Sequence, residues 1–161
     1  MAEQEVYQEP LMERLIKLFS TFFYVGMIPF APGTMGSFAG LFVFLSAKDA
    51  PLVCAALFAL ILCIGFLSAG RAEKVFGKKD PREVVIDEAA GIFIVFFMVP
   101  VNTLNILAGF VLYRVFDIFK PFPARRLEAL RGSFGIMSDD LLCGLYANLV
   151  LQVLLKLYIL H

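Results

Sequence analysis

The uncharged stretch at residues 51–69 constrains the fold of this chain more than any other feature. Its 19 residues carry no acidic or basic side chain, and a helix of that length can cross the hydrocarbon core of a bilayer. Hydrophobic residues make up 60% of the 161-residue chain, compared with about 45–50% in a soluble domain. A chain this short cannot bury the excess in a core that faces water. We therefore predict an integral membrane protein.

The order of apolar runs and helix breakers predicts an all-α, polytopic membrane bundle with about five crossings, some of them short. The first helix is amphipathic and would lie at the membrane interface. Pro100 and the polar residues after it interrupt a long apolar run, which indicates two helices joined by a turn. The segment RGSFGIMSDD is expected to be a loop, with Ser138 or Asp139 capping the last helix. The expected helices cover residues 11–28, 38–47, 51–69, 84–99, 104–119, 121–131 and 141–160.

The basic residues support the turn at Pro100. With that turn, 12 of the 14 lysines and arginines fall on one side of the membrane, and only Lys48 and Lys156 fall on the other. Cytoplasmic loops are rich in lysine and arginine, so we expect the basic side to face the cytoplasm. A single span over residues 89–113 would remove this bias. We expect one domain over residues 1–161, with residues 1–10 flexible.

Four motifs fall on the basic side: APGTMGS (31–37), DEAAG (87–91), RVFDIFKPFP (114–123) and GIMSDD (135–140). Ionised carboxylates beside hydrocarbon need partners, so they indicate a site. The motifs contain five acidic residues, and Arg114 and Lys120 are too few to neutralise them, whereas a divalent cation would. A ligand set made only of oxygen atoms favours Mg²⁺ over Zn²⁺. The alternative is that the acids only pair with lysine and arginine at the headgroup level. The five acids are Asp87, Glu88, Asp117, Asp139 and Asp140.

Two of these motifs suit the binding of phosphate. Arg114, Asp117 and Lys120 share one helix face, and the two cations could bind phosphate while Asp117 holds metal or orients Arg114. The alternative is an ion pair within the helix. PGTMGS would open a helix whose free amides, with the hydroxyls of Thr34 and Ser37, form an anion cradle. The alternative there is a capping and packing role.

In this order and spacing, the four motifs make the chain similar to the phosphatidylglycerophosphatase A family of bacterial inner-membrane lipid phosphatases. The resemblance runs from about residue 15 to residue 150, and the FDxxKPxP and GxGIMxDD patterns are its most specific parts. The chain departs from the family at Ser133, where glycine is frequent, and at Cys143, where alanine is usual. The residues that match are Thr34, Gly36, Asp87, Glu88, Arg114, Asp117, Lys120, Pro121, Pro123, Asp139 and Asp140.

The resemblance implies an Mg²⁺-dependent enzyme of phospholipid biosynthesis, which converts phosphatidylglycerophosphate to phosphatidylglycerol and inorganic phosphate on the cytoplasmic side of the inner membrane. Its partners would be an anionic phospholipid and the membrane, with no nucleic acid. Asp140 is the candidate base, and Asp117 is a second-choice metal ligand. The expected metal ligands are Asp87, Glu88, Asp139 and Asp140. The expected substrate contacts are Thr34, Gly36, Ser37, Arg114 and Lys120. The expected catalytic residues are Asp140, Asp139, Asp117, Arg114 and Lys120.

Several alternatives stay open at this point. The substrate could be another phosphorylated compound, and the carboxylates could instead bind a cation in a small transporter. A transporter would want acids near the middle of the bilayer, whereas here they gather at one end. Water, an aspartate or Thr34 could be the nucleophile, and the pattern fits one metal ion or two. The oligomeric state is not indicated by the sequence.

Overall fold

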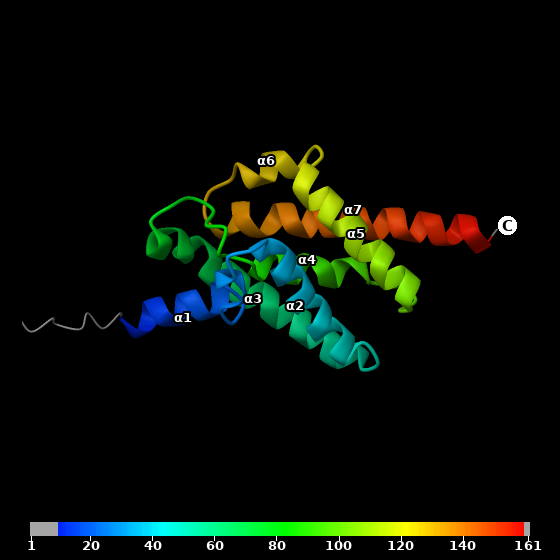
Figure 1. The fold of residues 1–161 in the computed structure, drawn as a ribbon, viewed down its shortest axis with the longest axis horizontal. Helices are drawn as coiled ribbons and strands as arrows, with labels where there is room; N and C mark the ends of the chain where they lie inside the picture. Colours follow the sequence, from blue (N-terminus) through cyan, green and yellow to red (C-terminus); the bar gives the residue numbers. More distant parts are fainter. Residues whose placement is uncertain (1–9, 160–161) are drawn as a thin grey trace, which may run out of the picture.

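The computed structural model describes residues 10–159 and is all-helical, with no strand in that range. In Figure 1 the last helix runs along the long axis of the molecule. The expected flexibility of residues 1–10 concerns a segment that, apart from Pro10, lies outside the described residues. The elements are α1 (Leu11–Ser20), the 3-10 helix η1 (Val25–Met27), α2 (Pro32–Ala47), α3 (Pro51–Phe76), α4 (Ile86–Val95), α5 (Thr103–Phe119), α6 (Ala124–Glu128) and α7 (Ser133–Ile159).

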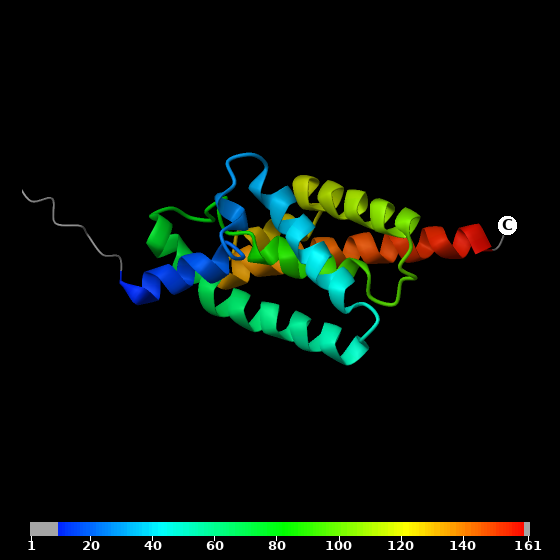
Figure 2. The ribbon, with the colours of Figure 1, turned by 60° about the horizontal axis from the view of Figure 1, so that its bottom comes forward.

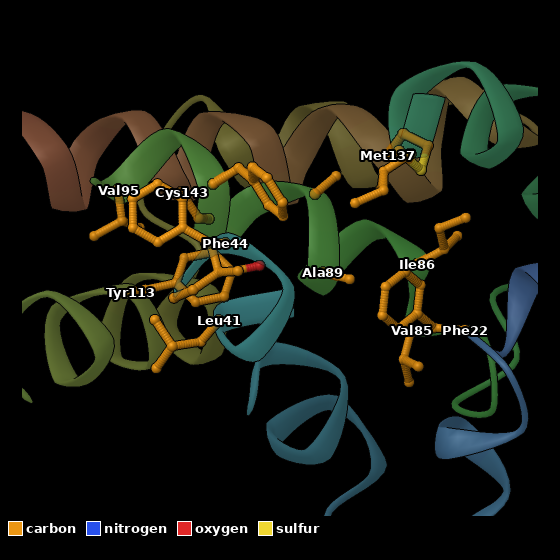
Figure 3. Packing of buried hydrophobic residues seen from close by; sticks show 14 of the residues in the cluster. Phe22, Leu41, Phe44, Val85, Ile86, Ala89, Val95, Tyr113, Met137 and Cys143 are labelled. Carbon is orange, nitrogen blue, oxygen red and sulfur yellow. The ribbon is translucent and has the colours of Figure 1, made fainter. Parts of the chain in front are cut away.

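The short helix α4 forms the centre of the molecule, because it packs against α2, α3, α5 and α7. Figure 3 shows side chains of α4 between those of the surrounding helices. Two glycines allow this close packing: a Cβ at Gly144 would overlap the carbonyl oxygen of Gly91, and a Cβ at Gly91 would overlap the ring of Tyr113. Glycine at these two positions therefore permits the close approach of α4 to α5 and α7.

An aromatic cluster fills the core around the C-terminal half of α4. The rings of Phe44 and Phe96 stack with their centroids 5.2 Å apart, and the ring of Phe93 lies edge-on to Phe44 at 5.7 Å. All three rings are buried. Such aromatic pairs add to the burial of apolar area in holding the helices together.

The predicted chain reversal near Pro100 is confirmed, because α4 ends at Val95 and α5 begins at Thr103. Asn102 caps α5 by accepting a hydrogen bond from the amide of Asn105 at 2.9 Å. The side chain of Asn105 donates to the carbonyl oxygen of Pro100 at 2.7 Å. The polar residues that predicted the turn therefore satisfy its backbone groups.

Asn148 of α7 completes the C-terminal end of α4. Its amide nitrogen donates to the carbonyl oxygens of Val95 at 2.9 Å and Phe97 at 2.8 Å. Its own oxygen accepts a hydrogen bond from Gln152 at 2.8 Å. The hydrogen bonds of Asn148 to Val95 and Phe97 therefore join α7 to the end of α4, whereas the bond from Gln152 stays within α7.

We expect Asn148→Leu to lower the free energy of unfolding by about 1–3 kcal/mol, because the carbonyl oxygens of Val95 and Phe97 lose this donor and the bond to Val95 is buried. The matched control is Gln152→Leu, which removes only the bond to Asn148 and should have a smaller effect. Thermal unfolding in detergent micelles measures both. Equal midpoints for the two variants would show that the carbonyl contacts of Asn148 add nothing to stability.

Two helices are long and apolar enough to cross a membrane: α3, over Pro51–Phe76, and α7, over Ser133–Leu157. Helix α2 is apolar but shorter. Large apolar side chains such as Leu52, Leu60 and Leu149 are exposed on the outside of these helices, which suits contact with lipid. Length and composition thus identify two spans, fewer than the number expected from the sequence.

Several predicted helix boundaries are wrong at the N-terminal side of the chain. Helix α1 ends at Ser20 instead of residue 28, because the hydroxyl of Thr21 donates to the carbonyl oxygen of Lys17 at 2.7 Å and the next three residues have positive φ. Helix α2 begins at Pro32 and not at residue 38, since proline suits the first turn of a helix. Helix α3 continues past residue 69 and ends at Phe76, because its C-cap, Gly77, adopts a left-handed conformation.

The predicted loop before the last helix is also wrong. Helix α7 begins at Ser133, so the GIMSDD segment is helical and neither Ser138 nor Asp139 caps the helix. The hydroxyl of Ser133 accepts a hydrogen bond from the amide of Gly70 at 2.8 Å, which ties the start of α7 to α3. Gly135 suggested a loop, but its lack of a side chain instead leaves room for the carbonyl of Leu130. The helices α4 and α6 are shorter than the predicted segments 84–99 and 121–131.

Candidate active site

A pocket of about 510 Å³ lies at the end of the molecule where α4 begins and α5 ends. All four sequence motifs contribute to its wall, together with the loop at residues 80–84. The chain reversal near Pro100 is the reason that they meet, because it returns the end of α5 to the start of α4. The predicted site residues that line the pocket are Thr34, Asp87, Glu88, Arg114, Asp117, Lys120, Asp139 and Asp140.

Three carboxylates form the centre of the pocket. Asp87, Glu88 and Asp140 each offer an oxygen, and these oxygens lie within 4.8 Å of one another. Asp87 and Glu88 sit in the first turn of α4, and Asp140 comes from α7. Like charges at this spacing repel, so the group needs a cation or protons to be stable.

Asp139 lines the same pocket but is not one of these three close acids, although it is next to Asp140 in the chain. Successive residues of a helix point about 100° apart, so the two neighbouring acids face different partners. The carboxylate of Asp139 accepts a hydrogen bond from the Lys120 ammonium. Both aspartates are only 2% exposed, and each therefore depends on its local partners for stability.

Arg114 links α5 to the start of α2. Its guanidinium pairs with Asp117 at 2.6 Å, one turn along the same helix, and donates to the hydroxyl of Ser37 at 3.2 Å. The Nε of Arg114 is buried and has no hydrogen-bond partner. Asp117 therefore orients Arg114, and one N–H of the guanidinium stays available for a ligand.

Lys120 lies directly after α5, between two acids. Its ammonium donates to Asp139 of α7 and lies 3.7 Å from Glu128 of α6. Burial lowers the pKa of Lys120, but the hydrogen bond to Asp139 and the charge of Asp140 outweigh this effect and raise the pKa above its ordinary value. Lys120 is therefore a fixed positive charge at neutral pH.

The start of α2 approaches the acids closely. A Cβ at Gly33 would overlap the carboxylate of Glu88, so glycine is required there. The amides of Gly33 and Thr34 belong to the first turn of α2 and have no partner within the helix. Gly36 and Ser37 do not line the pocket: Gly36 packs against Val85, and the Ser37 hydroxyl donates to the carbonyl of Gly33 at 2.9 Å. Of the segment expected to form an anion cradle, the amides of Gly33 and Thr34 are therefore the two that border the pocket.

Sequence analysis missed Tyr113, which is fully buried and donates from its hydroxyl to Asp140 at 3.2 Å. Figure 3 shows its ring among the core side chains. A tyrosine in an apolar run is usually a packing residue, but Tyr113 lies four residues before Asp117 and hence on the same helix face. That spacing was the available signal. The loop residues Asp80 and Arg82, which also line the pocket, carried no such signal.

The donor set fits a hard divalent cation. One oxygen each of Asp87, Glu88 and Asp139 is buried without a hydrogen-bond partner. Unsatisfied buried polar atoms are rare in stable proteins unless a ligand or water completes them. Carboxylate oxygens are the ligands that Mg²⁺ prefers, and zinc would call for nitrogen or sulfur. Cys143, the nearest thiol, donates to the carbonyl of Phe116 instead.

A comparison with known protein families identifies the chain. The sequence model of phosphatidylglycerophosphatase A matches residues 18–155, which includes every residue that lines the pocket. The chain belongs to the phosphatidylglycerophosphatase A family. As a member of that family, it is a phosphatase.

Relatives support this assignment. The chain is 40% identical over 139 residues to phosphatidylglycerophosphatase A of Haemophilus influenzae, covering 84% of this chain and 85% of the relative. It is 34% identical over 122 residues to the protein of the same name from Escherichia coli, covering 74% and 71%. A Bacteroides thetaiotaomicron protein, provisionally named phosphatidylinositol-3-phosphatase, is 36% identical over 145 residues, covering 84% and 91%. No solved structure matches the chain significantly.

Proposed function

We propose that this phosphatidylglycerophosphatase A family member removes the terminal phosphate of phosphatidylglycerophosphate, giving phosphatidylglycerol and inorganic phosphate. The observation that supports this most is the pocket itself, in which Asp87, Glu88 and Asp140 face Arg114 and Lys120. Three carboxylates so close together suit the binding of a metal ion, and the positive charges of Arg114 and Lys120 suit the binding of a phosphomonoester. The family name gives the lipid class of the substrate.

Mg²⁺ is the proposed cofactor, held by Asp87, Glu88 and Asp140, with Asp139 as a further candidate on its unpartnered oxygen. When bound, Mg²⁺ would supply charge stabilisation at the phosphoryl group and favour ionisation of a nucleophilic water. The carboxylates themselves keep the ion close to the start of α2. The fit rests on three orphaned oxygens and on the absence of soft ligands among the described pocket residues.

The protein residues have separable roles in this proposal. Arg114, fixed by Asp117, donates to phosphate oxygens, and Lys120 adds positive charge as the phosphoryl group transfers. The amides of Gly33 and Thr34 bind a phosphate oxygen at the start of α2. Asp140, oriented by the Tyr113 hydroxyl, accepts the proton of the attacking water.

The proposed membrane arrangement has about five crossings, formed by α2, α3, α4, α5 and α7. The pocket lies at the end that carries most basic residues, including Arg82, Arg125 and Arg126. Since basic loops face the cytoplasm, the pocket opens on the cytoplasmic side of a bacterial inner membrane. Helix α1, with exposed Leu11 and Met12, lies at the interface beside it.

The relative from Bacteroides thetaiotaomicron makes a second substrate worth testing, namely a phosphorylated phosphatidylinositol. Both lipids end in a phosphomonoester on a polyol, so the same cations could bind either. The inositol ring is bulkier than glycerol. The substrate that is turned over faster identifies the function of this chain.

Purified protein in detergent is expected to release phosphate from phosphatidylglycerophosphate faster than from phosphatidylinositol 3-phosphate or from soluble phosphomonoesters. Chelation with EDTA should stop the reaction and added Mg²⁺ should restore it, because the proposed reaction needs the charge stabilisation that a bound ion would supply. A phosphate-release assay measures all of these reactions side by side. Activity that survives exhaustive chelation would rule out the metal role, and a preference for the inositol lipid would reassign the substrate.

A further inference from the structure

We propose that the substrate lipid enters the pocket sideways, between the start of α2 and the end of α5, and that its acyl chains lie on the outer faces of these two helices. The proposal rests on the function proposed above and adds the entry route and the acyl-chain surface. The occupant is the diacyl part of a lipid whose headgroup ends in a phosphomonoester.

Both helices contribute residues to the lining of the pocket. Pro32 and Thr34 of α2 line one edge of it, and Arg114 and Ile118 of α5 line the other. Ile118 is also 69% exposed, so one side chain borders both the pocket and the outside of the molecule. In the view of Figure 2 the start of α2 and the end of α5 lie at the same end of the bundle, and their axes spread apart from there.

A ring pair bounds this opening on its far side. Phe38 of α2 and Phe110 of α5 stack with their centroids 4.3 Å apart. Phe38 lies one turn after Thr34, and Phe110 lies one turn before Arg114. The hydrogen bond from Arg114 of α5 to Ser37 of α2 also joins the two helices. A headgroup that enters between Pro32 and Ile118 therefore reaches Arg114 first, and the stack stops it from sliding further along the helices.

An apolar surface runs from the opening along the outer sides of both helices. Leu107, Val111 and Ile118 are exposed on α5. They share one helix face with Arg114, because Leu107, Val111, Arg114 and Ile118 are spaced at i, i+4, i+7 and i+11. On α2, Phe38 and Phe42 are exposed one turn apart. This surface is continuous with the charged pocket, so it can hold acyl chains while Arg114 holds the phosphate.

Sideways entry also follows from the chemistry of such a lipid. Lifting two acyl chains out of the bilayer would expose every methylene to water, which is unfavourable. If the chains stay against Val111 and Phe42, only the anionic headgroup leaves the lipid phase. The headgroup then meets the positive charges of Arg114 and Lys120, which compensate its loss of hydration.

Two other apolar grooves on the molecule are poorer candidates for the reacting lipid. One lies between α1 and α3 and includes Leu15 and Leu67, and the other lies between α5 and α7 and includes Phe116 and Tyr146. Neither groove shares a lining residue with the charged pocket. Lipid bound in either groove would have to move before its phosphate could react.

The first test uses Ile118→Trp, which narrows the opening. The substrates are phosphatidylglycerophosphate in mixed micelles and its deacylated, water-soluble form. The ratio of kcat/KM for the lipid to kcat/KM for the soluble form is expected to fall about tenfold or more, the scale of a steric mismatch in an apolar site. The matched control is Leu67→Trp, 56% exposed on α3, which should leave the ratio unchanged. An unchanged ratio in Ile118→Trp, or an equal fall in both variants, overturns the proposal.

The second test measures binding without turnover and exploits the absence of tryptophan from the chain. Val111→Trp and Leu67→Trp are each combined with Asp140→Asn, so each protein has one tryptophan. Phosphatidylglycerophosphate with brominated acyl chains should quench the Val111→Trp protein more than brominated phosphatidylcholine does at the same mole fraction. The Leu67→Trp protein should be quenched equally by the two lipids. Equal quenching of the Val111→Trp protein by both lipids overturns the proposal.

The two tests separate failure of the entry route from failure of the proposed function. If the wild-type protein releases phosphate from neither substrate, the proposed function fails, and the quenching experiment still decides whether the lipid docks between α2 and α5. If the wild-type protein hydrolyses the lipid but quenching shows no preference at Val111→Trp, the function stands and the route is wrong.

Discussion

Asp140→Asn is expected to reduce phosphate release roughly 10²–10⁴-fold, the range for loss of a general base. Asparagine has the same shape, and its side-chain oxygen can still accept the hydrogen bond from Tyr113 that fixes Asp140 now. Its loss of charge removes both a proton acceptor and a metal ligand from the group formed with Asp87 and Glu88. Activity should therefore fall without loss of the fold.

Thermal unfolding separates these two effects. In EDTA, Asp140→Asn should be at least as stable as the wild-type protein, because one of three mutually repelling carboxylates is gone. The increase in midpoint that Mg²⁺ gives the wild-type protein should be reduced, since a ligand that binds only the folded state stabilises it in proportion to its affinity. Asp49→Asn is the matched control, because Asp49 is exposed at the opposite end beside Lys48. Full activity in Asp140→Asn would remove both roles from this residue.

Lys120→Met is expected to lower activity roughly 10²–10³-fold, the usual effect of removing one electrostatic stabiliser of a transition state. It should also destabilise the protein, because the buried carboxylate of Asp139 loses its ion-pair partner. Breaking a buried ion pair from one side costs about 3–5 kcal/mol, and the partial exposure of Lys120 places this case towards the lower end. Arg125→Met, on the surface helix α6, should change neither quantity appreciably.

The double variant Lys120→Met/Asp139→Asn distinguishes structure from catalysis. Removing the stranded charge of Asp139 should restore much of the unfolding free energy, while phosphate release stays low. Recovery of activity together with stability would mean that Lys120 acts only on the fold. A larger loss of activity in Arg125→Met than in Lys120→Met would move the phosphate site to α6.

The sequence predicted the arrangement that matters most for the site. The turn near Pro100 was inferred from that proline and the polar residues after it, and the placing of the basic loops on one side supported it. That turn brings Asp87 and Asp117 into one pocket. The basic loops of a membrane protein gather on one side of the bilayer. The positions of the motifs along the sequence therefore predicted which of them lie on the same side and close together.

The partners of individual side chains were not predictable in the same way. Lys120 pairs with Asp139 across two helices, and Tyr113 reaches Asp140 from inside an apolar run. Both contacts depend on helix rotation, which no local pattern gives. The start of α7 was missed because glycine and serine suggest loops, whereas Ser133 and Gly135 serve contacts with Gly70 and Leu130.

The aromatic cluster of Phe44, Phe93 and Phe96 closes the far side of the site. It occupies the core around the second half of α4, while the carboxylates stand at the first half. The Tyr113 hydroxyl is the polar group beside Asp140, and closely packed rings follow further along α4. Water or an ion that enters the pocket should therefore leave by the way it came.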